Sequence, residues 1–258
     1  MNDAQTLLAA DEPKPVTVYN SDARSPFLLV ADHAGRTIPR VLGRLGVAES
    51  ELTRHIAWDI GIAGLGPMLA NALGVTLIQQ SYSRLVIDCN RPPGEPTSIP
   101  ETSELTAIPG NCSLSGVEKA LRANEIFWPY HERIDAELDR RKHAGLATAL
   151  IALHSFTPVF KGAARPWHCA LLYHRDPRLA QKLIALLGKE AGLIVGDNEP
   201  YFVSDTTDYT IPEHGERRGL PHALIEIRQD LIADEKGQRD WALRLARLLP
   251  LAYGEMSA

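Results

Sequence analysis

Short, almost continuously apolar runs alternate with longer segments of helical periodicity along most of the chain. Six apolar runs predict strands, at residues 27–31, 75–78, 85–87, 149–153, 170–173 and 223–227. Strands without polar alternation are typical of a sheet that helices cover on both faces. Longer patterns predict helices over about 58–73, 115–143, 176–192 and 238–249. This alternation predicts an α/β fold with one sheet between two layers of helices.

Local signals mark the ends of the predicted helices. Gly74 is well suited to the left-handed residue that ends the first helix. Ser115 and Glu118 have the spacing of a capping box, and Pro129 predicts a kink in the helix that follows them. Asp176 stands where the third helix needs a cap. These signals support the helical reading of the longer patterns.

The domain organisation is simple. Residues 1–24 are mixed polar with two prolines, and we expect them to be a poorly ordered or peripheral leader. We expect residues 25–258 to form a single α/β domain, because no linker or repeat divides them. Two long loops, 89–114 and 194–221, are candidates for functional segments.

Composition narrows the class of protein. The 258 residues are 45% hydrophobic and 23% charged, values that argue against intrinsic disorder. A net charge of −5 argues against a nucleic-acid partner, and no run approaches the roughly 20 apolar residues of a membrane span. The N-terminus does not resemble a secretory signal, and the three cysteines do not suggest a disulfide framework. We therefore expect a cytoplasmic protein without a membrane or nucleic-acid partner, and homo-oligomerisation stays open.

Polar side chains follow several of the predicted strands. His33 comes two residues after the first strand, Asn90 and Arg91 follow the third, and His154 follows the fourth. Glu226 lies inside the last strand. Ligands of open α/β sheets bind beyond the carboxyl ends of the strands. We therefore expect these residues to converge on one site.

Two of these residues, His33 and His154, favour a metal site. Each has an ordinary alternative on its own, as a turn histidine or as a buried structural histidine. A catalytic zinc takes three protein ligands, and neutral imidazole is a common one. The histidines lack the His-x-x-Glu spacing of zinc carboxypeptidases, because Arg36 stands at that position. We expect Asp59 to supply the carboxylate, with a helix N-cap as the alternative.

The segment from Arg84 to Arg91 favours recognition of a substrate carboxylate. In an extended segment, Arg84, Asp88 and Asn90 lie on one side. Arginine forks bind carboxylates in a bidentate manner. The alternative is an Arg–Asp pair that braces a loop. We expect Asp88 to brace while at least one arginine faces the substrate.

Glu226 is the predicted general base. A carboxylate between two isoleucines in a strand is unfavourable unless it is paired or has a raised pKa. A salt bridge to Arg228 is the structural alternative. Arg228 and the helical His131 complete the set of predicted substrate-binding residues.

The segments DHAG, HIAWDIG, SYSRLVIDCNRPPG, ALHSFTP and IEIRQDLI, in this order from about residue 26 to 235, resemble the N-formylglutamate amidohydrolase family. That family is similar to zinc carboxypeptidases and to the aspartoacylase and succinylglutamate desuccinylase group. The resemblance implies a zinc-carboxypeptidase-like fold, a three-layer mixed sheet flanked by helices. It implies one Zn²⁺ with His33 and His154 as first and last ligands, and Glu226 as the base. It also implies Arg84, Asn90 and Arg91 as the substrate clamp.

The expected function is zinc-dependent hydrolysis of N-formylglutamate or a related small anionic N-acyl amino acid. Two alternatives stay open. One is a deacylase or carboxypeptidase with a different substrate. The other is a non-catalytic carboxylate-binding protein that has lost the metal, which the missing Glu at position 36 suggests.

Overall fold

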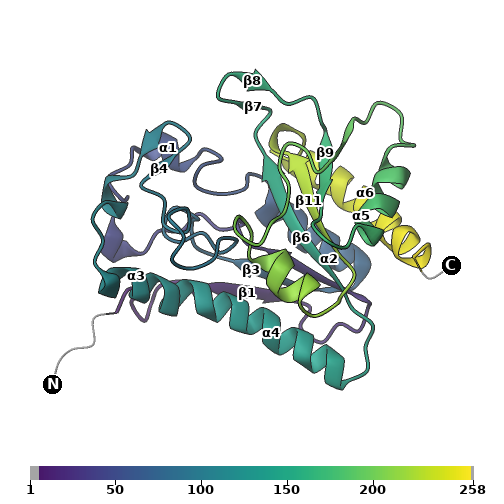
Figure 1. Cartoon of the computed structure of the whole chain (residues 1–258), viewed down its shortest axis with the longest axis horizontal. Coiled ribbons are helices and arrows are strands. Elements are labelled where there is room, and N and C mark those ends of the chain that lie inside the picture. The colour runs from purple at the N-terminus through teal and green to yellow at the C-terminus, as the bar shows by residue number, and fades with distance from the viewer. Residues whose placement is uncertain (1–5, 257–258) are drawn as a thin grey trace.

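The computed structural model describes residues 6–256, and its centre is a seven-stranded mixed sheet (Figure 1). The strands lie in the order β1-β3-β2-β6-β11-β9-β10. Their bounds are β1 Val16–Tyr19, β2 Phe27–Ala31, β3 Thr76–Gln80, β6 Ala149–Phe156, β9 Cys169–Leu172, β10 Val195–Asp197 and β11 His222–Arg228. β3, β2, β6 and β11 are parallel, β1 is antiparallel to β3, and β9 is antiparallel to β11. The parallel strands bring their carboxyl ends to one edge.

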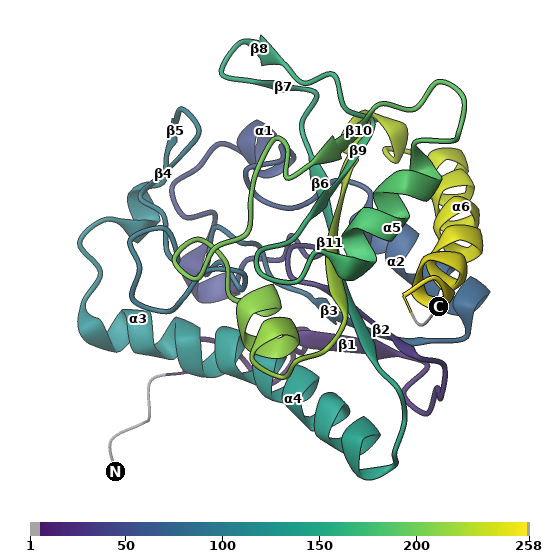
Figure 2. The ribbon, with the colours of Figure 1, turned by 45° about the vertical axis from the view of Figure 1, so that its right-hand side comes forward.

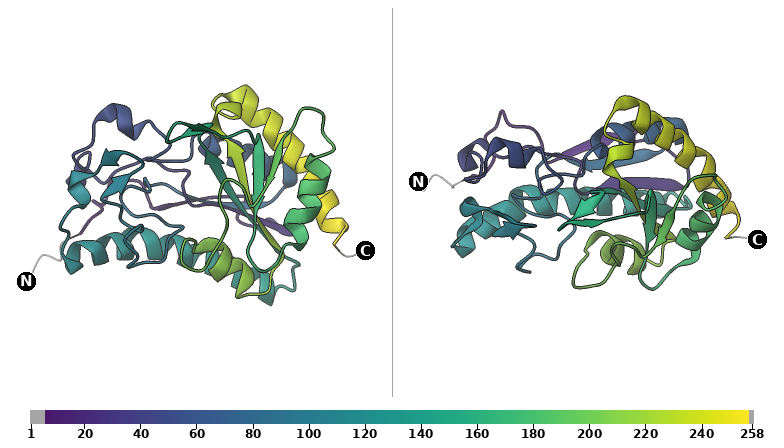
Figure 3. Two further views of the ribbon diagram at one scale, coloured as in Figure 1. Left: turned by 45° about the horizontal axis from the view of Figure 1, so that its top comes forward. Right: turned by 90° about the horizontal axis from the view of Figure 1, so that it is seen from above.

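Helices cover both faces of this sheet. α2 Ile62–Leu73, α5 Arg178–Leu187 and α6 Glu235–Gly254 pack on one face, where one apolar core forms between them and the strands. α4 Trp128–His143 packs on the other face over a second core (Figures 2 and 3). The strand residues are buried on both sides, which explains their nearly continuous apolar runs. The predicted α/β class with a mixed sheet between helical layers is confirmed.

The helix ends follow the local signals in the sequence. α2 ends at Gly74 with φ 62°, and Ser115 caps α3 Gly116–Arg122 in a capping box with Glu118. A π-helical turn, Ala123–Phe127, joins α3 to α4, and Pro129 lies at the start of α4. The proline lacks the N–H that a continuous α-helix would use there, so the irregular turn stands where a kink was predicted.

One predicted strand, residues 85–87, is wrong. These residues form a turn, in which the amide of Val86 donates to the carbonyl of Ser83 (2.9 Å) and the amide of Leu85 donates to its hydroxyl (3.2 Å). All three residues of the run are buried by side chains of the second core. The apolar run therefore reflects burial, and Ser83 decides the local backbone.

The sheet extends into the predicted leader. β1 pairs with β3 as an edge strand, and the amides of Leu7 and Leu8 donate to the carboxylate of Glu125. Residues 1–5 of that leader lie outside the described residues. Small elements occupy the remaining connections, namely α1 Glu49–Leu52 and the hairpins β4 Thr102–Ser103 with β5 Thr106–Ala107 and β7 Val159–Phe160 with β8 Ala163–Ala164. Within residues 6–256, none of the helices has the length and apolar character that crossing a bilayer takes.

Candidate active site

Four of the predicted site residues meet at the carboxyl edge of the parallel strands. His33 follows β2, His154 lies in β6, and Glu226 lies in β11 in register with His154. Asp59 comes just before α2, and its amide donates to the carbonyl of His33 (2.8 Å). Residues far apart in the sequence are thus held together by the sheet and by one backbone hydrogen bond.

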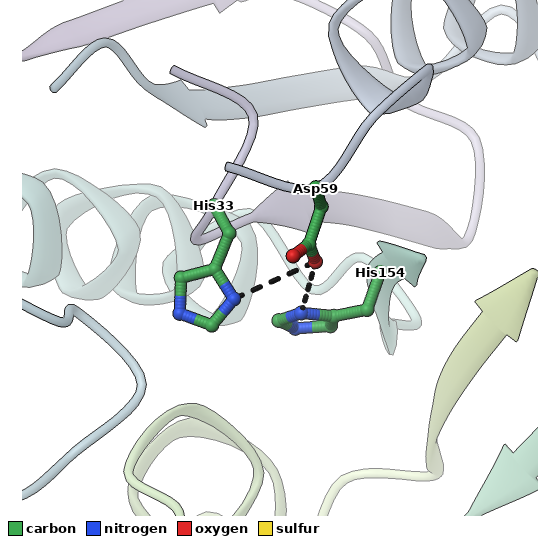
Figure 4. A group of neighbouring side chains, drawn as sticks. All are labelled: His33, Asp59 and His154. Carbon is green, nitrogen blue, oxygen red and sulfur yellow. Dashed lines mark hydrogen bonds and ion pairs between the residues drawn. The ribbon is translucent and has the colours of Figure 1, made fainter. Parts of the chain in front are cut away.

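His33, Asp59 and His154 form a candidate metal centre (Figure 4). Asp59 Oδ2 lies 2.9 Å from His154 Nδ1 and 3.5 Å from His33 Nδ1. One ligand atom from each residue lies within 4.8 Å of the others. His33 Nδ1 is buried and has no hydrogen-bond partner among the described residues. Two imidazole nitrogens and one carboxylate oxygen, turned toward one another, are a donor set that suits zinc.

The outer nitrogen of each imidazole is held by its own buried carboxylate. His33 Nε2 lies 2.7 Å from Asp88 Oδ1, and His154 Nε2 lies 3.0 Å from Asp32 Oδ2. A carboxylate at Nε2 holds a proton on that nitrogen and orients the ring, so that Nδ1 is the nitrogen that would bind a metal once it has lost its own proton. This arrangement of imidazole and outer carboxylate is common at protein metal sites.

The electrostatics of the cluster favour charged carboxylates. Burial raises the pKa of Asp59, but His33 and His154 outweigh it and hold that pKa below its usual value. Burial likewise opposes ionisation of Asp88, and Arg84 with His33 lowers its pKa. For His154, burial lowers the pKa, while hydrogen bonds to Asp32 and Asp59 raise it well above the ordinary value.

Glu226 differs from these aspartates because the neighbouring charges do not outweigh its burial. Its Oε2 has no hydrogen-bond partner among the described residues, and the side chain of Arg228 pairs with Asp230 instead. Burial raises the pKa of Glu226 to about 7, with His154 opposing the shift and Asp59 adding to it. A carboxyl group with this pKa exchanges protons near neutral pH, as a general base must.

These groups line one cavity of about 340 Å³. Its wall contains polar and charged side chains as well as apolar ones. The lining consists of His33, His55, Asp59, Arg84, Asn90, Arg91, His154, Ser155, Phe156, Thr157, Leu172, Pro200, Tyr201, Phe202, Thr207, Asp208, Leu224 and Glu226. Seven of the nine predicted site residues are therefore in one pocket. The volume suits a small-molecule ligand.

The Arg84–Arg91 segment enters the pocket as a turn and not as the extended chain expected from its spacing. Arg84 Nε and Nη2 both donate to Asp88 Oδ2, at 3.0 and 2.6 Å, so Arg84 and Asp88 brace each other. Asn90 Oδ1 accepts hydrogen bonds from the amides of Tyr209 and Thr210. Its Nδ2 donates to Asp208, which precedes Tyr209 in the chain. Arg91 donates through Nη1 to backbone carbonyls. Its Nε and Nη2 have no hydrogen-bond partner among the described residues.

His131 and Arg228 lie outside the lining of this pocket. Arg228 donates to Asp230 on the protein surface. His131 is buried in α4 behind the pocket, with Nε2 2.8 Å from the carbonyl of Cys89 and Nδ1 2.8 Å from His214 Nε2. His131 thus supports the turn from behind, at a place where it does not reach a ligand in the cavity.

Several residues of the site had no prominent signal in the sequence. Asp32 is one, although it stands beside His33 in the chain. Tyr201 and Phe202 lie in a segment that the sequence predicts only as a long loop, and the sequence makes His55 only a weak candidate for the site. Asp32 directly follows the predicted strand 27–31, whereas His55, Tyr201 and Phe202 lie away from the ends of the predicted strands.

A second group of metal-ligand types, His174, Asp205 and Glu216, lies at the surface. Arg175 pairs with both Asp205 and Glu216 there. Both carboxylates already pair with Arg175, so the buried group remains the candidate metal centre.

Comparison with known proteins identifies the family. A family model described as N-formylglutamate amidohydrolase matches residues 25–233. A solved structure of a gene product from Agrobacterium tumefaciens is 37% identical, covering 98% of this chain and 100% of that one, with a TM-score of 0.94. The structure of N-formylglutamate amidohydrolase from Ralstonia eutropha is 20% identical, covering 93% and 98%, with a TM-score of 0.65, and shares the fold. A search of curated proteins gives no match.

Proposed function

The chain belongs to the N-formylglutamate amidohydrolase family, a family of hydrolases, and from this premise we propose a specific activity. We propose that the protein is a zinc-dependent amidohydrolase that releases the acyl group of N-formylglutamate or a related N-acyl amino acid. The observation that supports this most directly is one cavity that holds the His33–Asp59–His154 group together with the unpartnered Glu226.

The residues present fit zinc. His33, Asp59 and His154 would hold the ion, because their donor atoms face one another and the buried Nδ1 of His33 lacks another partner. Zinc bound there supplies Lewis acidity, which makes water more acidic and polarises a carbonyl group. Asp59 takes the place of the carboxylate that zinc carboxypeptidases carry three residues after their first histidine.

Glu226 is the proposed general acid and base. It takes a proton from water as the water oxygen bonds to the acyl carbon. It then gives this proton to the amide nitrogen as the carbon–nitrogen bond breaks, so that an acid and a free amino acid leave. A pKa of about 7 allows the same carboxyl group to perform both transfers.

Arg91 is the proposed binding partner of the substrate carboxylate. Arg84 is engaged by Asp88, and Asn90 uses its amide oxygen on backbone N–H groups, so these two shape the pocket wall. Arg91 retains free N–H donors at the cavity. A guanidinium that can still donate is the group best able to bind an incoming carboxylate.

The test is release of glutamate from N-formyl-L-glutamate before chelation, after chelation, and after zinc is added back. We expect activity to disappear and return, and Glu226→Gln to lower kcat at least 100-fold. Glu235→Gln, at an exposed carboxylate of α6, is the matched control and is expected to retain full activity. Activity that survives complete metal removal contradicts the zinc mechanism, and a loss below tenfold in Glu226→Gln contradicts its role.

A panel of N-formyl, N-acetyl and N-succinyl amino acids and short peptides then separates the proposed substrate from other deacylase or carboxypeptidase substrates. The pocket volume and the arginine admit each of these classes. Ligand binding without turnover in a zinc-loaded protein would favour the non-catalytic alternative.

A further inference from the structure

A buried arginine beside the pocket has no part in the proposed mechanism. Arg165, just after β8, is 8% exposed, and its Nη1 donates to the hydroxyl of Tyr201 at 2.8 Å. Within residues 6–256, no carboxylate lies within 4.0 Å of its guanidinium nitrogens. Burial of a cation is unfavourable without a compensating partner. The buried charge of Arg165 must therefore be stabilised by groups other than a carboxylate of the described residues.

Aromatic rings provide part of the compensation. The guanidinium carbon of Arg165 lies 4.6 Å from the ring centroid of Phe160, 4.7 Å from that of Tyr201 and 5.9 Å from that of Phe156. Cation–π contacts at these distances are favourable. They also fix the guanidinium so that one of its N–H groups points at the Tyr201 oxygen.

The direction of this hydrogen bond determines whether the Tyr201 hydroxyl can donate to a ligand. A guanidinium has no acceptor, so the Tyr201 oxygen accepts and its own proton is left to donate. Among the described residues, no acceptor takes that proton. Tyr201 is 39% exposed, and partial burial of its side chain raises the pKa of the hydroxyl. A hydroxyl that accepts from a cation is a stronger donor through its own proton.

Tyr201 stands where two cavities adjoin. It lines the reaction pocket and also a second cavity of about 350 Å³ toward residues 97–104, and His55, Arg84 and Arg91 line both as well. The lining of the second cavity does not include His33, His154 or Glu226. Tyr201 and Arg91 thus present donors to a part of the ligand that extends away from the reacting bond.

We propose that Tyr201 is a specificity-determining hydrogen-bond donor to one carboxylate of the substrate, and that Arg165 is the positioning residue that orients and polarises its hydroxyl. This rests on the proposed function for the identity of the substrate. A carboxylate is the expected acceptor because Arg91, whose Nε and Nη2 have no hydrogen-bond partner among the described residues, lines the same two cavities as Tyr201.

The test compares N-formyl-L-glutamate with its two mono-amides, N-formyl-L-glutamine and the α-amide. We expect Tyr201→Phe and Arg165→Met each to raise KM for N-formyl-L-glutamate at least tenfold and to change kcat less than threefold. Against one of the mono-amides, the same substitutions should change KM less than twofold, because the carboxylate that Tyr201 contacts is missing. Arg165→Lys should restore part of the affinity, because an ammonium also donates to the hydroxyl.

The control is Tyr173→Phe, which removes a hydroxyl that accepts from Gln181 outside both cavities and should leave KM unchanged. A loss in kcat with unchanged KM, or equal KM effects on both mono-amides, overturns the proposal. If the unsubstituted protein hydrolyses none of the three compounds, the proposed activity on N-formylglutamate fails. Calorimetric Kd values for the same compounds then decide this inference: weaker binding in both variants supports it, and no binding by the unsubstituted protein overturns it.

Discussion

Replacing Asp32 by Asn tests how the candidate metal centre is built. Asp32 Oδ1 accepts hydrogen bonds from the hydroxyls of Tyr130 and Thr210, both at 2.8 Å, and Oδ2 faces His154 Nε2 at 3.0 Å. Asn keeps an oxygen for the two hydroxyls but turns an NH₂ group toward Nε2. Two donors then face each other unless His154 moves its proton from Nε2 to Nδ1, where it blocks metal binding.

The expected magnitude follows from the role of Asp32 behind the ligand. Loss of an outer hydrogen bond to a metal-binding histidine weakens metal affinity by about 10- to 100-fold. This corresponds to about 1.4 to 2.8 kcal/mol of binding free energy. We expect the larger value, because the substitution reverses the hydrogen bond at Nε2 and does not merely remove it.

Zinc affinity is measured by competition with a chromophoric chelator, at a protein concentration where the chelator and the site share the metal. Tyr130→Phe and Thr210→Val are the matched controls, since each removes a hydroxyl from Asp32 and leaves the contact to His154. We expect each control to lower the free energy of unfolding by about 1 kcal/mol and to change zinc affinity less than threefold. Thermal unfolding of the Asp32→Asn protein establishes that it is folded.

A folded Asp32→Asn protein that binds zinc within threefold of the unsubstituted affinity would refute this reasoning. Ligation through Nδ1 of His154 would then not depend on the carboxylate behind it. Equal losses in the two hydroxyl controls would also contradict it, because the effect would come from general loosening of the buried cluster.

Three further predictions concern other parts of the molecule. Glu226→Gln should retain about one equivalent of zinc by elemental analysis while its kcat falls, because Glu226 is not in the ligand group. Arg122→Met should lower the free energy of unfolding in urea by about 2 to 4 kcal/mol, because the buried guanidinium donates to two carbonyls and an amide oxygen that would lose their partner. Gly35→Ala should destabilise the protein by more than about 2 kcal/mol, since a Cβ there would lie 2.0 Å from the backbone of Ser81. Gly116→Ala, with no atom within 4 Å of the added Cβ, should be neutral or stabilising in the same measurement.

Sequence periodicity was sufficient to place the strands that carry the site. The runs before His33, around His154 and around Glu226 are apolar on both faces, and the sheet buries both faces. Their carboxyl ends meet because the strands are parallel neighbours. The role of Asp59 could not be decided from the sequence, because the residues around it are compatible with a helix N-cap as well as with a metal ligand. Only the fold brings Asp59 to the two histidines.

The Arg84–Arg91 segment shows where periodicity was not sufficient. Its apolar residues are buried in the second core, as in a strand, but the side chain and carbonyl of Ser83 close a turn. Hydrogen bonds of a serine side chain to nearby amides are local, and they do not change the periodic pattern of apolar residues in the sequence. In this turn Arg84 and Asp88 brace each other, and Arg91 lines the pocket with N–H groups that have no hydrogen-bond partner among the described residues.

The buried charges explain why these separate segments form one centre. Asp32, Asp59 and Asp88 contribute three negative charges, and Arg84 contributes one positive charge. If both imidazoles are deprotonated at Nδ1, as metal ligation there requires, these four side chains and two imidazoles carry two net negative charges, which one divalent cation would neutralise. Each aspartate alone is an ordinary loop residue in the sequence. The proposal of a divalent metal therefore depends on the joint burial of these aspartates around two histidines. This joint burial is a property of the folded chain and cannot be predicted from any local sequence pattern.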